Sequence, residues 1–403
     1  MGLSVCGFSH KTASLEDREI FQLGRSELPE ACAAYREIAQ CEETVVVATC
    51  NRVEFYQFTR DKTDHLKAVI EFYKSRGISE VDKLREISYC HHKTTTARHI
   101  FRVSAGLESM VLGEDQVFHQ LKEAYSAACS VDGPGKILHK LFHLAFQVGK
   151  QIRAETNVGS GPRSVPGAAL EMLRNRMDGG TPRAALVIGV NEMTEIILDG
   201  LARWGIPTYL ANRTADKANK LAAPFKAKTL TLDNITSVIG EVDAVFSATS
   251  APGIIVKEEY FDDLDGDNVP VYLIDLAIPR DIDPALGDLP GMVILDLQDM
   301  KRFLDHIEQV RAEDVPLAEK MIEEQVSAYS IWRTKLKQET LLLEVHRDLN
   351  KMRKVELERF KDGFRLSEHR ALDAFSQSLV KNFMRILPEV LEVDETSDKK
   401  TKS

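Results

Sequence analysis

The sequence predicts a multidomain α/β protein, and three patterns support that prediction. Residues 1–157 mix strand-like apolar runs with amphipathic helices, which is typical of an α+β domain. Residues 158–298 contain apolar runs that alternate with helical stretches, the pattern of a doubly wound parallel sheet. From Asp299 onward no glycine occurs until Gly363, and charged and apolar residues interleave at helical spacing. This last pattern predicts long helices.

The overall composition limits the kind of protein and where it works. With 403 residues, the chain is long enough for about two to four domains. Its net charge of -10 argues against a surface that coats nucleic acid, although it permits one local basic face. No apolar run approaches the roughly 18 residues of a membrane span, and the N-terminus lacks the basic segment of a signal peptide. We therefore expect a cytoplasmic protein without a membrane partner.

The cysteines do not indicate a metal site. All six lack the paired spacing of metal ligands, so we expect reduced thiols and no bound metal. The run Cys90-His91-His92 does not change this expectation, because three adjacent residues cannot all face one ion.

Within the N-terminal region, strand and helix patterns follow one another closely. Residues 3–9 and 53–58 have the character of strands, and Ser14 is placed to cap a helix. Residues 95–128 and 136–155 have helical periodicity. These elements together predict one α+β domain.

The segment Thr49-Cys50-Asn51-Arg52 carries the residues most suited to chemistry. It follows the apolar run 45–48, which we interpret as a buried strand whose carboxyl end meets a ligand, as in open α/β sheets. A thiol at Cys50 can attack a carbonyl, and Arg52 can hold a carboxylate through two contacts. The alternative is a structural cysteine beside a surface arginine.

The second region has the pattern of a nucleotide-binding sheet with an altered phosphate loop. The dinucleotide fingerprint G-x-G-x-x-G is only partly present, because Asn191 and Thr194 replace the second and third glycines after Gly189. Asn tolerates positive φ, so we expect the turn to survive. Asn212 stands about where NAD enzymes have an acidic residue, and Arg213 follows it. An arginine there fits a 2′-phosphate, which favours NADPH over NADH. A degraded nucleotide site is the alternative. The five predicted strands are residues 184–190, 207–211, 244–249, 272–278 and 293–297.

The C-terminal region predicts helices that pack against another chain. Pro316 must either kink a long helix or open a new one at its first turn. Residues 333–370 carry 11 basic and 7 acidic side chains, an excess opposite in sign to the whole chain. Apolar residues recur there at helical spacing and could bury a face against a second subunit. They are Leu341, Leu342, Val345, Leu349 and Met352.

Seven segments in order along the chain resemble the glutamyl-tRNA reductase family. The final helical region resembles that family too. The segments are G-F-S-H-K-T-A (7–13), T-C-N-R-V-E (49–54), R-H-I-F (98–101), G-L-E-S-M-V-L-G-E-D-Q (106–116), E-T (155–156), N-R-T (212–214) and I-D-L-A-I-P-R-D (274–281).

The resemblance implies a homodimer of four-part subunits. In each subunit, an α+β catalytic domain that recognises glutamate would span residues 1–157. A Rossmann-like NADPH domain would span residues 158–298. A long spinal helix (299–340) would lead to a helical dimerisation domain (341–392). Residues 393–403, charged and without a helical pattern, are expected to form a disordered tail.

The resemblance also implies an activity and its site. The family uses NADPH to reduce glutamate carried on tRNA(Glu) to glutamate-1-semialdehyde, the first committed step of five-carbon tetrapyrrole (haem and porphyrin) biosynthesis. Cys50 would be the nucleophile that forms a thioester, and His99 would support it. Glutamate-1-semialdehyde aminomutase is a further candidate partner, and the C-terminal helices are expected to contact tRNA phosphates. The implied substrate-binding residues are Thr49, Asn51, Arg52, Ser109, Glu114, Asp115, Gln116 and Gln120. The implied cofactor-binding residues are Gly189, Val190, Asn191, Glu192, Met193, Thr194, Asn212 and Arg213.

Two other interpretations remain open at this point. One is a reductase-like regulatory protein that has lost NADPH binding, which only Asn191 favours. The other is an NADP-dependent Rossmann enzyme of the shikimate-dehydrogenase type, which the N-terminal region does not resemble.

Overall fold

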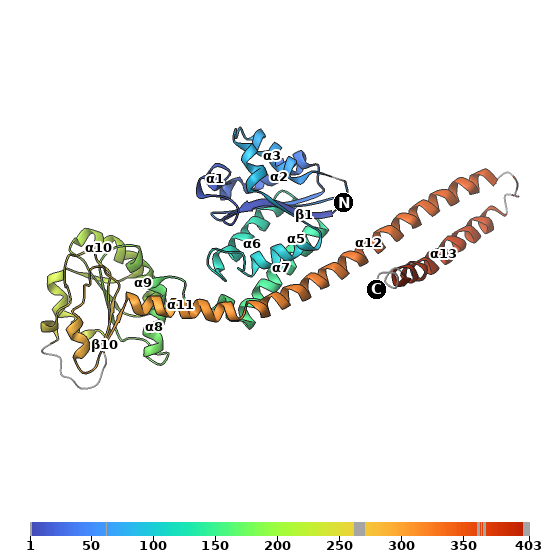
Figure 1. Ribbon diagram of the computed structural model, residues 1–403. Helices are drawn as coiled ribbons and strands as arrows, with labels where there is room; N and C mark the ends of the chain where they lie inside the picture. Colours follow the sequence, from blue (N-terminus) through green and yellow to red (C-terminus); the bar gives the residue numbers. More distant parts are fainter. Residues whose placement is uncertain are drawn as a thin grey trace. The chain divides into compact units, whose positions relative to one another are not determined.

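The computed structural model describes residues 2–61, 63–261, 271–360, 363, 365 and 368–397 (Figure 1). The chain divides into two compact units, Met1–Glu323 and Glu324–Ser403. No helix within the described ranges is long and apolar enough to cross a bilayer.

A four-stranded sheet in the order β2-β3-β1-β4 forms the centre of the N-terminal domain. Every neighbouring pair is antiparallel. Helices α1–α3 lie on one side of this sheet and α5–α7 on the other, as Figure 1 shows. This arrangement confirms the predicted α+β domain. The strands are β1 (Gly2–Ser9), β2 (Glu43–Thr49), β3 (Arg52–Thr59) and β4 (Tyr89–His92), and the helices are α1 (Leu15–Ile20), α2 (Leu28–Ala39), α3 (His65–Ser75), α4 (Leu84–Ile87), α5 (Thr94–Ser104), α6 (Asp115–Cys129) and α7 (Lys136–Glu155).

Aromatic side chains fill the core on both faces of this sheet. Because side chains alternate along a strand, neighbours in β3 pack on opposite sides. Phe55 contacts Tyr35 and Phe72, with ring centroids 4.6 and 5.2 Å apart, on the side of α2 and α3. Tyr56 contacts Phe142 of α7 at 5.4 Å. The sheet is thus held rigidly from both sides.

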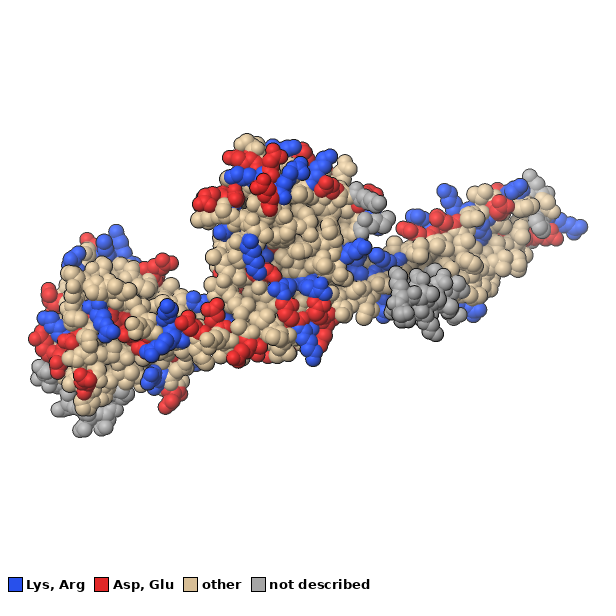
Figure 2. Space-filling model, in the orientation of Figure 1, with Lys and Arg blue, Asp and Glu red and all other residues tan. Residues whose placement is uncertain are grey.

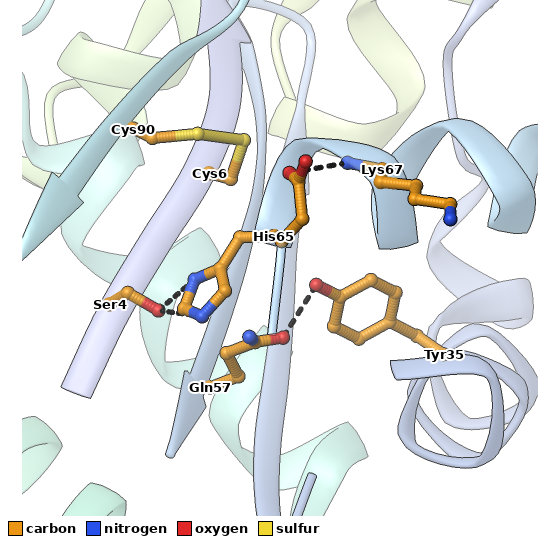
Figure 3. Close-up of a disulfide and its surroundings, with 8 residues drawn as sticks. Ser4, Cys6, Tyr35, Gln57, His65, Lys67 and Cys90 are labelled. Atoms are coloured by element: carbon orange, nitrogen blue, oxygen red, sulfur yellow. Dashed lines mark hydrogen bonds between the residues drawn. A yellow bond between two sulfur atoms is a disulfide. The ribbon is translucent and has the colours of Figure 1, made fainter. Parts of the chain in front are cut away.

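A disulfide joins β1 to β4 (Figure 3). The strand register places Cys6 directly opposite Cys90, with Cα atoms 4.2 Å apart. The expectation that all thiols are reduced is therefore wrong for this pair. The two cysteines are 84 residues apart in the sequence, so only the strand pairing reveals the bond.

The second sheet has six parallel strands in the order β10-β9-β8-β5-β6-β7. This order reverses between β5 and β8, where doubly wound sheets bind nucleotides. All five predicted strands are present. The sequence did not reveal β7, which is a short edge strand with mostly exposed residues. The elements are α8 (Val165–Arg176), β5 (Ala185–Ile188), α9 (Glu192–Arg203), β6 (Thr208–Ala211), α10 (Ala215–Ala222), β7 (Lys228–Leu230), β8 (Ala244–Ser247), β9 (Val271–Asp275) and β10 (Met292–Asp296).

The predicted spinal helix is two helices that meet at Asp314. Helix α11 (Leu297–Glu313) ends there and α12 (Val315–Phe360) begins with Pro316 in its first turn. Pro316 therefore opens a new helix, the second of the two predicted options. Arg311, only 3% exposed, donates to the carbonyl groups of residues 160–162, so the end of α11 is fixed to the segment before α8.

The C-terminal unit contains the rest of α12 and α13 (His369–Ser397). An apolar groove of about 480 Å³ lies between these two helices, lined by residues that include Leu349, Phe360 and Leu379. Helix α13 covers residues 393–397, which the sequence analysis placed in a disordered tail. The remainder of that predicted tail, 398–403, lies outside the described residues.

Candidate active site

Cys50 lies on a two-residue turn between β2 and β3. Thr49 and Arg52 are paired across the hairpin, which leaves only Cys50 and Asn51 in the turn. The Thr49 hydroxyl accepts from the N–H groups of Asn51 and Arg52, at 3.1 and 3.2 Å. Arg18 of α1 donates to the Cys50 carbonyl at 2.7 Å and to the Asn51 side-chain oxygen at 3.2 Å. The turn is held firmly while the Cys50 residue itself is exposed.

This position corrects one step of the sequence argument. Cys50 does follow a buried strand, but the sheet is antiparallel, so the rule for the carboxyl edge of parallel sheets does not apply. The turn is accessible for a local reason, because a cavity of about 210 Å³ lies beside it. The cavity is lined by Phe8, Leu15, Arg18, Glu19, Gln22, Thr49, Cys50, Arg52 and Val53.

Two other free cysteines, Cys32 and Cys41, differ from Cys50 in their surroundings. Burial raises the pKa of Cys32 to about 11 and that of Cys41 to about 12. Both remain protonated and inaccessible at neutral pH. Of these three thiols, only Cys50 is placed to attack a substrate.

Arg52 and His99 meet at the buried carboxylate of Glu54. Arg52 is 2% exposed and donates through Nη1 to Glu54 Oε1 at 2.9 Å. The same oxygen lies 2.8 Å from Nε2 of His99 and accepts from the Tyr89 hydroxyl at 2.5 Å. The Tyr56 hydroxyl donates to Oε2 at 2.6 Å. Glu54 is fully buried, and all four partners are donors.

The electrostatic balance at Glu54 favours the ionised carboxylate. Burial alone would raise the pKa of Glu54, but its contacts with His99 and Arg52 and the hydrogen bond from Tyr56 outweigh it. They hold the pKa well below its usual range. Burial and the neighbouring Glu54 charge raise the pKa of Tyr56 and Tyr89 well above its ordinary value, so both hydroxyls keep their protons and donate.

A closed turn between α5 and α6 packs against the Arg52–Glu54–His99 cluster. Gly106 and Gly113 both have positive φ, and the Gly113 N–H donates to the Gly106 carbonyl at 3.0 Å. A Cβ atom on Gly113 would lie 1.6 Å from the Val158 carbonyl oxygen, so only glycine fits. The predicted single helix over 95–128 is therefore wrong, because this turn divides it. Arg52 Nη2 donates to the Glu108 carbonyl within the turn.

The Glu108 side chain connects the turn to α5 and α12. Its carboxylate accepts from Lys11 and, at 2.7 Å, from Arg102 Nε. Burial alone would raise the pKa of Glu108, but these two cations outweigh it and lower the pKa. Arg102 also pairs with Glu319 of α12. The start of α12 is thus in contact with the residues that hold the turn.

The structure brings together only some of the predicted substrate residues. Thr49, Asn51 and Arg52 form the hairpin, and Ser109 lies in the closed turn. Its hydroxyl is buried and has no hydrogen-bond partner among the described residues. The remaining four are grouped at the start of α6. Glu114 precedes the helix, Asp115 forms an ion pair with Arg153 at 2.9 Å, and Gln116 and Gln120 lie one helical turn apart.

The predicted nucleotide loop joins β5 to α9 at the point where the strand order reverses. Gly189 has φ 106°, and a Cβ atom there would lie 2.4 Å from the Ala248 carbonyl oxygen. We expected a positive φ at Asn191, but its φ is −158° and its backbone is extended. Its side chain caps α9 instead, accepting from the Thr194 N–H at 3.0 Å and donating to the Ala248 carbonyl at 2.6 Å. The altered loop is therefore a well-bonded turn.

The other predicted cofactor residues surround this loop. Arg213 is exposed just after β6, and the Asn212 side chain donates to the Thr214 carbonyl at 3.0 Å. Val190 and Met193 pack against the core of the domain, and Glu192 is exposed in the first turn of α9.

Sequence reasoning assigned no role to Glu54, Tyr89 or Glu108. One signal could have revealed Glu54. Arg52 and Glu54 alternate with apolar Val53 and Phe55, which places two opposite charges on one face of a buried strand. No comparable signal marks Tyr89 or Glu108, whose positions depend on strand pairing and on the closed turn.

The fold and the site together define a class of two-domain Rossmann-type protein. Proteins of this class combine a parallel Rossmann-type sheet with an α+β domain that presents a cysteine beside buried charged residues. Three family profiles match the chain: "Glutamyl-tRNAGlu reductase, N-terminal domain" over residues 6–156, "Shikimate / quinate 5-dehydrogenase" over 171–303, and "Glutamyl-tRNAGlu reductase, dimerisation domain" over 317–400. The shikimate-type likeness is thus restricted to the Rossmann region.

Comparisons over nearly the whole chain agree with these profiles. The glutamyl-tRNA reductase of Geobacter metallireducens is 33% identical over 363 residues, covering 89% of this chain and 83% of that protein. The one from Citrifermentans bemidjiense is 28% identical and covers 97% and 92%. The solved structure of glutamyl-tRNA reductase from Methanopyrus kandleri has a TM-score of 0.82 at 27% identity, covering 96% and 94%. The chain belongs to the glutamyl-tRNA reductase family.

Proposed function

We propose that this enzyme reduces the glutamyl group of glutamyl-tRNA(Glu) to glutamate-1-semialdehyde with NADPH, through a thioester at Cys50. The observation that carries the proposal is the exposed Cys50 on a fixed turn, beside the buried Arg52–Glu54–His99 cluster, in a chain of this family. Nothing in the site favours the non-catalytic alternative, since the cysteine, arginine and histidine are all in place.

The purified chain, supplied with glutamyl-tRNA and NADPH, is expected to form glutamate-1-semialdehyde with equal loss of NADPH. Aldehyde trapping and absorbance at the nicotinamide band measure the two quantities. Glutaminyl-tRNA is the control substrate, since it lacks the side-chain carboxylate. A folded preparation that consumes neither glutamyl-tRNA nor NADPH would refute the proposal.

Each residue of the site has a separate task in this reaction. The Cys50 thiolate attacks the ester carbonyl, and the ribose hydroxyl leaves with a proton as the thioester forms. Within the part of the chain that the structure describes, the buried Arg52 Nε has no hydrogen-bond partner, so it can pair with the glutamate side-chain carboxylate. His99 has Nε2 against Glu54, which leaves Nδ1 for proton transfer. NADPH, when bound, supplies the hydride for the reduction.

The residues around the β5–α9 loop fit a nicotinamide dinucleotide. Gly189 allows the close approach that a side chain would block, and the N-terminus of a 12-residue helix favours a phosphate. Arg213, exposed at the end of β6, is placed to bind a 2′-phosphate. NADPH is therefore the proposed cofactor.

The Arg213→Ala variant is expected to narrow the preference for NADPH over NADH about ten- to a hundred-fold, mainly by weakening NADPH. A charged hydrogen bond contributes roughly 1.5–3 kcal/mol, which corresponds to that range. Titration of each cofactor measures the ratio. The Arg203→Ala variant, which removes an exposed arginine at the far end of α9, is the matched control. An unchanged ratio in Arg213→Ala would show that another group reads the 2′-phosphate.

We further propose that the active form is a homodimer held by the C-terminal helices. Phe375, Leu379, Phe383 and Ile386 are each at least half exposed on α13 and recur at helical spacing.

Figure 2 shows basic and acidic side chains interspersed along the C-terminal helices, so tRNA phosphates would meet a mixed surface there. Contact with an aminomutase remains a proposal, as do the domain limits of 157, 298, 340 and 392.

Negative charge introduced among these four apolar residues of α13 is expected to produce monomers. The double variant Leu379→Glu/Phe383→Glu would bury two carboxylates at the proposed interface, which is strongly unfavourable. Sedimentation velocity gives the mass in solution. Lys381→Glu, on a neighbouring position of the same helix, is the control and should leave the mass unchanged. A dimeric double variant would place the interface elsewhere.

A further inference from the structure

We propose that Glu54 is a positioning residue that fixes Arg52 and His99 relative to the Cys50 turn. The inference rests on the proposed function and deepens it, because it concerns how the reactive residues are held. The Glu54 carboxylate forms hydrogen bonds with Arg52, Tyr56, Tyr89 and His99. It is fully buried beneath the two residues that we assign to substrate binding and proton transfer.

The contacts of Glu54 explain why one edge of Arg52 remains available. Nη1 is bonded to Glu54, and Nη2 is bonded to the Glu108 carbonyl. These two bonds fix both terminal nitrogens of the guanidinium, whereas the buried Nε has no partner in the described ranges. A carboxylate that reaches Arg52 therefore finds an oriented donor. Without Glu54, the same guanidinium would have no fixed direction and no buried counter-charge.

The contact with His99 selects which ring nitrogen carries the proton. A carboxylate at 2.8 Å from Nε2 requires a hydrogen on that nitrogen. In the neutral ring, Nδ1 is then the acceptor, as in other carboxylate–histidine pairs. The Tyr89 and His91 rings lie tilted against the His99 ring, with centroids 5.3 and 4.9 Å away, so the His99 ring cannot turn freely.

A purely structural ion pair would not need this arrangement. One oxygen of Glu54 accepts from Arg52, Tyr89 and His99 together, which come from three separate elements, β3, β4 and α5. The two residues with chemical tasks thus share one acceptor atom. A change at that atom must alter both tasks at once, and this joint effect distinguishes positioning from general stability.

The Glu54→Gln variant tests the proposal, with Glu43→Gln as the matched control. Glu43 is another buried glutamate of the same sheet, which accepts from the N–H groups of Ile137 and Leu138 at 3.0 and 2.6 Å. Two rates are measured without NADPH: thioester formation with glutamyl-tRNA and with glutaminyl-tRNA. Nitrogen-15 NMR of labelled histidine reports which nitrogen of His99 is protonated.

Glu54→Gln is expected to slow thioester formation at least about a hundred-fold and to reduce the glutamyl-over-glutaminyl preference at least about ten-fold. His99 should lose its single Nε2–H form. Glu54→Asp should recover part of both effects, since it restores the charge. Glu43→Gln should lower thermal stability alone.

Three outcomes decide the matter. If Glu54→Gln keeps the rate, the preference and the His99 tautomer, the positioning role is wrong while the proposed function stands. If the wild-type chain forms no thioester, the proposed function fails instead. If Glu54→Gln does not fold, Tyr89→Phe decides: it retains the charge but removes one donor, and it should shift both measurements about three- to ten-fold in the same direction. An unchanged Tyr89→Phe variant would overturn the proposal.

Discussion

Replacing Cys50 by serine is expected to abolish aldehyde formation, with a loss of at least about a thousand-fold in turnover. An alcohol at this position is protonated at neutral pH and is a poor nucleophile towards the ester. Cys50 is exposed, so the fold should be unchanged. The decisive measurement is the capture of labelled glutamate on the protein in the absence of NADPH.

The Cys129→Ser variant is the control for this experiment. Cys129 is also a free cysteine, at the end of α6, but is only partly exposed. It should retain full activity and full glutamate capture. Substantial turnover in Cys50→Ser would mean that reduction does not pass through a thioester at this residue.

Replacing Arg52 by alanine is expected to remove activity and to destabilise the N-terminal domain by about 3–5 kcal/mol. The substitution leaves the buried carboxylate of Glu54 without its arginine partner, as well as removing the proposed ligand for glutamate. Denaturant unfolding followed by the fluorescence and amide exchange of this domain measures the stability. Arg60→Ala, an exposed arginine just beyond the other end of β3, should change little.

The pH dependence of this stability follows from the direction of the Glu54 shift. The pKa of Glu54 is lower in the folded chain than its ordinary value of 4.5. The contribution is therefore fully present at pH values well above 4.5 and is lost as the pH falls below it towards the folded pKa. Arg52→Ala removes one cause of the low pKa, so acid unfolding should begin at a higher pH than in the wild type. Identical acid transitions would contradict this account of the cluster.

Local sequence patterns were sufficient for most of the fold. Five of the six strands of the Rossmann sheet are apolar runs, and α7 was predicted with its observed ends because its periodicity is uninterrupted. The short strand β7 was missed, since its three residues are mostly exposed and have no apolar signal. The break between α5 and α6 was also missed. It depends on contact between Gly106 and Gly113 and on the packing of Val158, 45 residues further along the chain.

The candidate site was predicted in part, for a related reason. Cys50 and Arg52 can be recognised from the sequence because a reactive thiol and a carboxylate-binding arginine lie within one four-residue segment, 49–52. The contact of Glu54 with Tyr89 and the Cys6–Cys90 bond depend on the pairing of β1 with β3 and β4, which no local pattern encodes. Asn191 shows the opposite limit. It departs from the glycine fingerprint, yet its side chain supplies the cap and the tether that hold the loop.

The two-residue turn at Cys50 imposes a strict length on this part of the chain. In a hairpin of this kind, inserting or deleting one residue beyond the turn shifts the register and moves every following side chain to the opposite face of the sheet. Arg52 and Glu54 would then face α1–α3, and Val53 and Phe55 would face α5. The segment from Thr49 to Glu54 should therefore tolerate substitutions at Asn51 far better than any change in length. A library of single-residue insertions scanned across β2 and β3 should contain no active member within this window.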